Sequence, residues 1–311
     1  MQPTFRYVAP AGAPIGAFDL ARWAARLLSG GDVSTGLAGA LKSRLGADQV
    51  FLTSTGRAGL TILLQAMRDL APPERNEVIL PAYTCYSVAA SVIKAGLVPK
   101  VIDISASTLD YDREELEAAD FTRALALVAT NLYGLPNDLP ALSTLAKARG
   151  VFLIDDAAQA LGAVVGGRPS GTWGDAGLYS FDKGKNISAI DGGAIVTQSH
   201  DLAASLKRRM DVLTSAGPKA AAMMIAKTAV YSMMLRPWLY WIPHSLPQLG
   251  LGQTVFTTDF PLAKPTTPEI ALAQTMLGRL EQFTAARTSK AAALLEGLRA
   301  THRLTPIEPL A

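Results

Sequence analysis

Three short stretches of this chain carry residue types that can act together on one ligand. The first is Ser54–Arg57, a Ser-Thr-Gly-Arg turn between an apolar run and a helix-like segment. Amides at a helix start lack partners and the helix dipole is positive there, so such a turn is suited to binding phosphate. The second stretch places Asp155 and Asp156 after an apolar run, and the third carries Lys183 and Lys185 among glycine and polar residues. A buried lysine of lowered pKa is a nucleophile.

Each stretch also has an ordinary structural explanation when it is taken alone. A Thr or Asp before a helix commonly serves as its N-cap, and two lysines among glycines are typical of a solvated loop. Taken together, the three stretches hold the parts of a pyridoxal-phosphate site: a phosphate cradle, an acid for the pyridine nitrogen and a lysine for the aldehyde. The 29 positions that separate Asp156 from Lys185 leave room for the chain to return to the same edge of a sheet.

The elements that must position these residues are short apolar runs that alternate with helix-like segments. Strands are predicted at residues 50–54, 77–83, 98–104, 124–130 and 151–155, with two more at 178–181 and 194–197. Continuous apolar strands separated by helices predict an α/β fold with a mostly parallel sheet covered by helices on both faces. Ligands of such sheets bind outside the carboxyl ends of the strands, which is where the three stretches lie.

The rest of the chain differs in character from this alternating region. We predict a large domain over residues 1–200, then a basic helix and an apolar, proline-rich insert over 201–265. A long helix that packs over the large domain is expected in the remaining part, 266–311, with Thr266 or Thr267 as its cap. We interpret this last part as a reduced small domain.

Composition excludes several classes of protein. Of the 311 residues, 49% are hydrophobic and 18% are charged, which is too apolar for a disordered chain. A net charge of +3 without a basic block gives no sign of nucleic-acid binding. One cysteine and three histidines exclude a disulfide framework, and we expect no metal site. Because the first residues do not resemble a secretory signal, a cytoplasmic location is expected.

The motifs, in their order along the chain, resemble the DegT/StrS family of sugar aminotransferases, which have the fold type I architecture of aspartate aminotransferase. The matching segments lie between about residue 40 and residue 197, and they include STGRAGL, NLYGLPNDLPAL, FLIDDAAQALGA and SFDKGKNISAIDGGAIVT. The resemblance implies a large domain that binds pyridoxal 5'-phosphate, followed by a reduced C-terminal helical part.

The resemblance also implies roles for individual residues. Lys185 matches the catalytic lysine that holds the cofactor aldehyde and then moves the α-proton as general base and acid, and Lys183 does not match it. Asp156 would pair with the protonated pyridine nitrogen, Ser180 would bind the cofactor phosphate, and Gln159 would lie beside the cofactor ring.

At other positions the chain departs from the family pattern. Gly56 and Arg57 match a Gly-Thr pair whose backbone binds phosphate, so the threonine hydroxyl is replaced by a guanidinium. Cys85 takes the place of an aromatic residue that stacks on the cofactor, with Tyr83 or Tyr86 as candidate substitutes. In addition, Asn131 stands where many members of the family have a histidine, before the Leu-Tyr-Gly segment. The family's Asn-Tyr-Arg segment is not recognisable, and residues 218–262 occupy roughly its place.

The activity implied by the resemblance is transfer of an amine from an amino acid, such as glutamate, to a keto-sugar nucleotide for polysaccharide or glycan assembly. A homodimer is the expected assembly. The alternative is a relative that binds the cofactor but is catalytically impaired and acts as a regulatory or partner subunit. A dehydratase of the same fold is disfavoured, because those relatives replace with histidine the lysine that stands here at position 185.

The strongly apolar segment at residues 220–242 has two interpretations. Lys227, Arg236 and Pro237 interrupt it, so it falls short of the ~20 apolar residues that a spanning helix needs. It is either a buried dimer element or lid, which we favour, or a peripheral membrane contact with its Trp and Tyr residues at headgroup depth.

Overall fold

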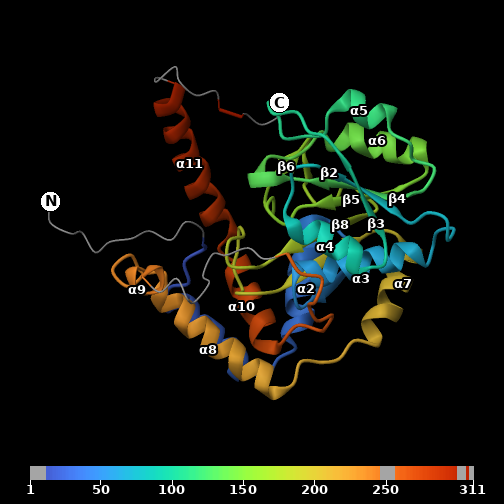
Figure 1. Ribbon diagram of the computed structural model, residues 1–311. Helices are drawn as coiled ribbons and strands as arrows, with labels where there is room; N and C mark the ends of the chain where they lie inside the picture. Colours follow the sequence, from blue (N-terminus) through green and yellow to red (C-terminus); the bar gives the residue numbers. More distant parts are fainter. Residues whose placement is uncertain (1–11, 246–255, 300–305, 308–311) are drawn as a thin grey trace.

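The computed structural model describes residues 12–245, 256–299 and 306–307. A seven-stranded sheet forms its centre, with strand order β1-β9-β8-β5-β4-β2-β3 (Figure 1). The strands are β1 (Gln49–Thr53), β2 (Glu77–Pro81), β3 (Val98–Ile102), β4 (Ala124–Thr130), β5 (Phe152–Asp156), β8 (Ala176–Ser180) and β9 (Gly193–Thr197). A separate pair, β6 (Val164–Val165) and β7 (Arg168–Pro169), forms a short antiparallel hairpin.

Strand direction places the carboxyl ends of most strands at one edge of the sheet. β3, β2, β4, β5 and β8 pair in parallel. β9 pairs antiparallel with both β8 and β1, so β9 runs against the other strands of this sheet. The predicted mostly parallel sheet is confirmed. The reversal of β9 has a simple cause, since the segment 181–192 that carries the lysines returns the chain directly beside β8.

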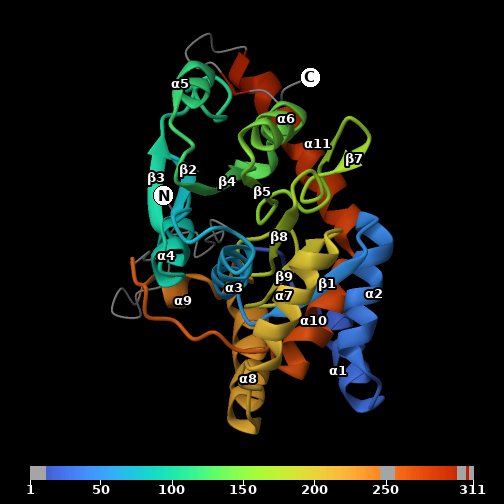
Figure 2. The same ribbon diagram turned by 90° about the vertical axis from the view of Figure 1, so that its right-hand side faces the viewer.

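Helices cover both faces of this sheet, as predicted (Figure 2). One face packs against α3 (Gly56–Arg68), α4 (Tyr86–Lys94) and α7 (His200–Asp211). The opposite face packs against α5 (Arg113–Ala118), α6 (Leu139–Arg149), α1 (Ala17–Leu28), α2 (Val33–Leu45) and α10 (Thr267–Leu277). Strand side chains alternate between the layers: Leu178 of β8 joins the first layer, and its neighbour Tyr179 joins the second.

The predicted C-terminal helix is interrupted. Thr266 is the N-cap of α10 and forms a capping box with Glu269. α10 ends at the C-cap Gly278, and a second helix, α11 (Leu280–Arg299), follows after a break of two residues (Figure 1). Because α11 buries only Leu280 and Phe283 among its described residues, the expectation that one long helix packs over the domain holds for α10 and is wrong for most of α11.

The apolar insert contains α8 (Pro218–Met234) and the short α9 (Trp241–His244). Both lie at the rim of the molecule, beside the N-terminal end of the described chain (Figure 1). A one-turn 3₁₀ helix (Leu132–Gly134) follows β4 and completes the described elements. None of the helices in the described ranges is long and apolar enough to cross a bilayer.

Candidate active site

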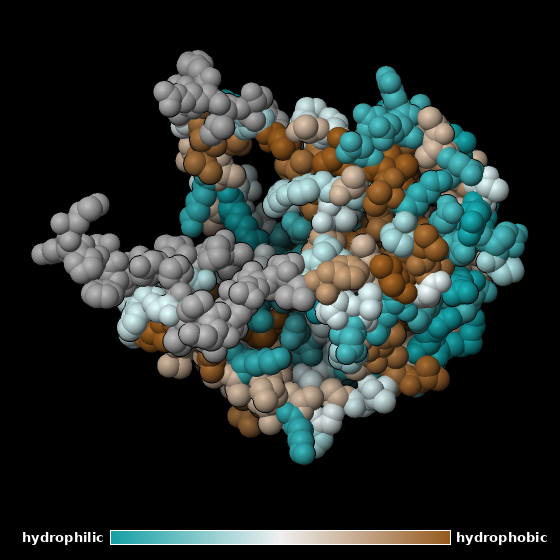
Figure 3. Space-filling view, in the orientation of Figure 1, coloured by the Kyte–Doolittle hydropathy of each residue, from teal (hydrophilic) through white to brown (hydrophobic). Residues whose placement is uncertain are grey.

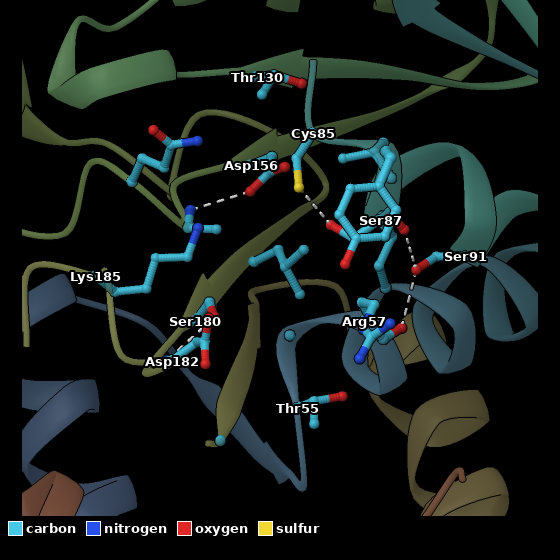
Figure 4. Close-up of a pocket in the computed structure, with 18 of the residues that line it drawn as sticks. Thr55, Arg57, Cys85, Ser87, Ser91, Thr130, Asp156, Ser180, Asp182 and Lys185 are labelled. Carbon is cyan, nitrogen blue, oxygen red and sulfur yellow. Dashed lines mark hydrogen bonds between the residues drawn. The ribbon is translucent and has the colours of Figure 1, made fainter. Parts of the chain in front are cut away.

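A cavity of about 300 Å³ opens at the carboxyl edge of the sheet. The seven residues predicted to form the site all line it, although they come from five separate segments (Figure 4). They are Gly56, Arg57, Cys85, Asp156, Gln159, Ser180 and Lys185. Their roles stay predictions, but their placement in one cavity follows from the strand order, which brings the ends of β1, β2, β5 and β8 to one edge.

The turn between β1 and α3 forms the floor of this cavity. The hydroxyl of Thr55, the N-cap, accepts a hydrogen bond from the Ala58 amide at 3.0 Å. Gly56 then begins the helix against the side chain of Ser180, and a Cβ on Gly56 would lie 3.0 Å from the Ser180 Cβ. A side chain at position 56 would therefore push the helix start and this serine apart. The helix amides, the dipole and the Ser180 hydroxyl converge where a phosphate would bind.

The two adjacent acids at the end of β5 have different surroundings. Asp155 is fully buried and accepts hydrogen bonds from Asn131 Nδ2 at 2.8 Å, from the Gly171 amide at 2.6 Å and from the Trp173 amide at 3.1 Å. Burial nevertheless raises the pKa of Asp155 to about 6. Through these hydrogen bonds Asp155 connects the end of β5 to the residues that follow β7.

Asp156 points to the other side of the strand and lines the cavity. Within the described residues its carboxylate accepts one hydrogen bond, from the Ala158 amide at 3.0 Å. Burial raises the pKa of Asp156, and the charge of Lys185 acts against that shift. A buried carboxylate with so few donors is suited to a cationic partner that enters the cavity, such as a protonated ring nitrogen.

Lys185 lies in the segment between β8 and β9, and its side chain extends toward Asp156 (Figure 4). The Lys185 amide donates to the Asp182 carbonyl at 3.0 Å, which forms a tight turn. Its own carbonyl accepts a hydrogen bond from Arg287 of α11 at 3.1 Å. Lys183 is not among the cavity-lining residues, and its carbonyl accepts from the Tyr231 hydroxyl at 2.9 Å. Position 185 is therefore the one of the two whose amine reaches the site.

Gln159 and Asn131 are held by the segment that follows β4. The side-chain oxygen of Gln159 accepts a hydrogen bond from the Tyr133 amide at 3.0 Å. Tyr133 adopts a left-handed backbone (φ 57°), which is strained for a residue with a side chain and is common at functional sites. Asn131, which also lines the cavity, directs its amide to Asp155. Asn131 thus positions the acid pair.

Arg57 and Cys85 show how the departures from the family pattern are accommodated. The guanidinium of Arg57 lies over the ring of Phe260, 5.0 Å from its centroid. Cys85 is the N-cap residue of α4, and its sulfur accepts a hydrogen bond from the Ser87 hydroxyl at 3.0 Å. Of the two tyrosines considered as substitutes for a stacking aromatic, Tyr86 lines the cavity and Tyr83 does not.

Several residues that line the cavity were not predicted as site residues. Ser87, Ser91, Thr130, Asp182, Asp191 and Gly192 belong to this group. Asp191 and Gly192 directly precede β9 and belong to the Asp-Gly-Gly part of the motif that contains Lys185. This position in the motif could have indicated that they lie at the site. Burial raises the pKa of Asp191, and Asp182 contributes further.

The donor set fits pyridoxal 5'-phosphate. The start of α3 with Ser180 suits its phosphate, the buried Asp156 suits its ring nitrogen, and the Lys185 amine suits its aldehyde. The close approach of Gly56 to Ser180 and the sparse hydrogen bonding of Asp156 are observations of this chain that agree with such a ligand.

Comparisons with known proteins agree with this assignment. The chain is 36% identical over 151 residues to UDP-N-acetyl-3-dehydro-alpha-D-glucosamine 3-aminotransferase of Acidithiobacillus ferrooxidans, covering 48% of this chain and 41% of that protein. It is 40% identical over 129 residues to a pleiotropic regulatory protein of Geobacillus stearothermophilus, covering 41% of this chain and 35% of that protein. The chain thus spans less than half the length of these relatives.

Among solved structures, DesI in the presence of its TDP-sugar product aligns with a TM-score of 0.64 and 25% identity, covering 89% of this chain and 62% of that one. The profile of the DegT/DnrJ/EryC1/StrS aminotransferase family matches residues 21–310. A match of that extent, on a fold and cavity that agree with it, shows that the chain belongs to the DegT/DnrJ/EryC1/StrS aminotransferase family.

Proposed function

We propose that this protein is a pyridoxal-phosphate-dependent aminotransferase that moves an amine from an amino acid to a keto-sugar nucleotide. Proteins of its family depend on pyridoxal 5'-phosphate. The observation that carries the proposal is the presence of the Lys185 amine and the buried Asp156 carboxylate in one cavity with Ser180 and the start of α3. When bound, the cofactor supplies an electron sink for the carbanion that forms when an amino acid loses its α-proton.

The chain's own residues perform the binding and the proton transfers. The buried Asp156 carboxylate would pair with the protonated ring nitrogen, and the low dielectric would strengthen that attraction. Ser180 and the first turn of α3 bind the phosphate. The Lys185 amine would hold the cofactor aldehyde and, once an amino-acid donor has displaced it, would take up the α-proton as general base and give a proton back as general acid.

The substrates are proposed on two grounds. The cavity is lined by hydroxyl, amide and carboxylate groups, which suit polar, multiply hydroxylated ligands. Relatives and solved neighbours include an aminotransferase named for a UDP-linked keto-sugar and DesI with its TDP-sugar product. L-Glutamate is the proposed donor, and glycan or polysaccharide assembly is the proposed use of the product. A cytoplasmic homodimer is the proposed assembly.

The first experiment measures cofactor attachment. Purified protein is incubated with pyridoxal 5'-phosphate, reduced with borohydride and digested, and the modified residue is located by mass spectrometry. Attachment is expected at Lys185 in the unaltered chain and to be lost in Lys185→Ala. Lys183→Ala is the matched control, because Lys183 lies two residues away outside the cavity lining, and it should leave attachment unchanged. Attachment elsewhere, or none, contradicts the proposal.

The second experiment separates the catalytic role from the alternative role as a regulatory or partner subunit. L-Glutamate is added to the cofactor-loaded chain, and 2-oxoglutarate is measured in a single turnover. One equivalent of 2-oxoglutarate per site is expected. A chain that carries the cofactor on Lys185 but yields no 2-oxoglutarate would support the non-catalytic alternative, to which the regulatory relative points.

A further inference from the structure

The helix α8 presents an apolar face to the outside of the molecule. Its exposed residues recur at helical spacing on one side, with more than half of the Met223 and Val230 side chains exposed (58% each). Ala222, Ala226, Ala229 and Met233 complete this face. A surface helix of a globular protein normally shows the opposite pattern, with its polar side facing water. The outer face of α8 therefore lacks a covering partner within the described residues.

The inner face of the same helix is the more polar one. Met224, Thr228 and Ser232 are buried there, and the two hydroxyls donate to carbonyls of α8 itself. The inner side also contacts the segment 181–192 that carries the lysines, called the catalytic segment below. The Tyr231 hydroxyl donates to the Lys183 carbonyl at 2.9 Å, and Lys227 Nζ lies 3.8 Å from the Asp191 carboxylate. These contacts fix the orientation of α8, so its apolar outer face is a consequence of how the helix is attached.

Charge indicates what this outer face binds. Between Asp211 and Asp259 the sequence contains no Asp or Glu, whereas Lys219, Lys227 and Arg236 are present. Lys219 and Arg236 are exposed near the two ends of α8. Trp238, which is 56% exposed, follows directly, and tryptophan is favoured at the boundary between headgroups and hydrocarbon. Exposed apolar residues with basic groups at both ends suit an anionic lipid surface.

A second copy of the chain fits this face less well. In a two-fold arrangement the same patch meets itself, so the basic residues of both copies would come together in a stretch that has no carboxylate to pair with them. Figure 3 shows apolar surface along the lower edge of the molecule, where α8 runs in Figure 1.

We propose that the outer face of α8, together with Trp238, binds the protein peripherally to an anionic membrane surface. In this arrangement α8 lies on the membrane surface and does not cross the bilayer. Because Lys183 and Asp191 contact the inner side of α8, binding would hold the catalytic segment about one helix diameter, roughly 10 Å, from the lipid. This inference does not depend on the proposed catalytic activity.

The test is flotation of the full chain with vesicles of phosphatidylcholine alone or with 30% phosphatidylglycerol. We expect flotation with the anionic vesicles and at least about fivefold less with the neutral ones, since each basic residue near an anionic surface contributes about a factor of five. Met223→Asp/Val230→Asp should abolish flotation, because carboxylates on the outer face oppose insertion. Val101→Asp/Leu294→Asp is the matched control, since both residues are equally exposed (63% each) outside α8. It should float like the unaltered chain.

Two results would overturn the proposal. One is an unaltered chain that remains at the bottom of the gradient with anionic vesicles. The other is equal flotation of the unaltered chain and Met223→Asp/Val230→Asp. Analytical ultracentrifugation of the same variants identifies the competing occupant: if the aspartates convert a dimer to a monomer and vesicle binding is absent, the face joins two copies of the chain. Circular dichroism of each variant confirms that the substitutions leave the fold intact.

Discussion

Helices α8 and α10 have similar apolar compositions, yet they are buried to very different extents. Nine of the eleven residues of α10 are buried, whereas three of the seventeen residues of α8 are buried. Both helices also have a proline in the first turn. Apolar composition alone therefore does not separate a core helix from one whose apolar face lies outside.

The difference comes from long-range contacts. α10 packs between α1 and α2, and its first turn is tied to α1 because Trp23 Nε1 donates to the Pro268 carbonyl at 2.8 Å. At its other end, Arg279 pairs with the buried carboxylate of Asp19 in α1. α8 is attached through one side only, to the segment 181–192, to α10 and to the chain at Gly12. A helix is buried when other elements cover both of its sides, and among the described residues nothing covers the outer side of α8.

The largest effect that would test this comparison is expected in α10. Leu272 is fully buried, so Leu272→Ala should lower the free energy of unfolding by about 2–5 kcal/mol through lost burial and the cavity left behind. Urea denaturation followed by circular dichroism measures the change. If the loss were below about 1 kcal/mol, α10 would not be the core helix that its burial indicates.

The next effect concerns Glu269 in the first turn of α10. Burial raises the pKa of Glu269 from its ordinary value of 4.5 to about 8. The folded chain therefore binds more protons than the unfolded chain between these values, so stability should be highest near pH 4.5 and fall as the pH rises toward 8. Glu269→Gln should flatten this part of the profile by at least about 1.4 kcal/mol, the equivalent of one pKa unit. Identical profiles for the two proteins would contradict the prediction.

A smaller effect is expected at the contact between α1 and α10. Trp23→Phe keeps an aromatic ring at this buried position, smaller than the indole, and removes the hydrogen bond to the Pro268 carbonyl. The loss should be about 1 kcal/mol in the free energy of unfolding. Trp238→Phe is the control, since Trp238 is exposed and its replacement should leave the urea midpoint unchanged. Equal effects of the two substitutions would argue against the contact.

The smallest effect on folding is expected on the outer face of α8. Val230 is more than half exposed, so Val230→Ala should change the free energy of unfolding by less than about 0.5 kcal/mol. The measurement is the same urea titration used for Leu272→Ala. A loss comparable with that of Leu272→Ala would mean that the outer face of α8 is buried in solution, by a second copy or another segment.

Much of the site could be predicted from sequence because its signals are local. Strand boundaries agree within about two residues, since each strand is a compact apolar run bounded by polar residues or glycine. The choice of Asp156 over Asp155, and of Lys185 over Lys183, came from the family motifs. The structure agrees with both choices, because Asp156 and Lys185 line the cavity while Asp155 is occupied by backbone donors.

Other features had no local signal. The pairing of Arg57 with Phe260 joins positions about 200 residues apart, and the contact of Gly56 with Ser180 depends on β1 and β8 lying on either side of β9. The interruption at Gly278 was also missed, since the helical spacing of apolar residues continues across it.

The sequence by itself determined the elements, the family and the residues expected to line the site, because periodicity, capping and motif spacing act over a few neighbouring residues. Only the tertiary structure decided which backbone amides bind Asp155, where α11 leaves the core and that α8 exposes its apolar side. These outcomes depend on which distant segments pack together, and burial is a property of those contacts that no single segment encodes.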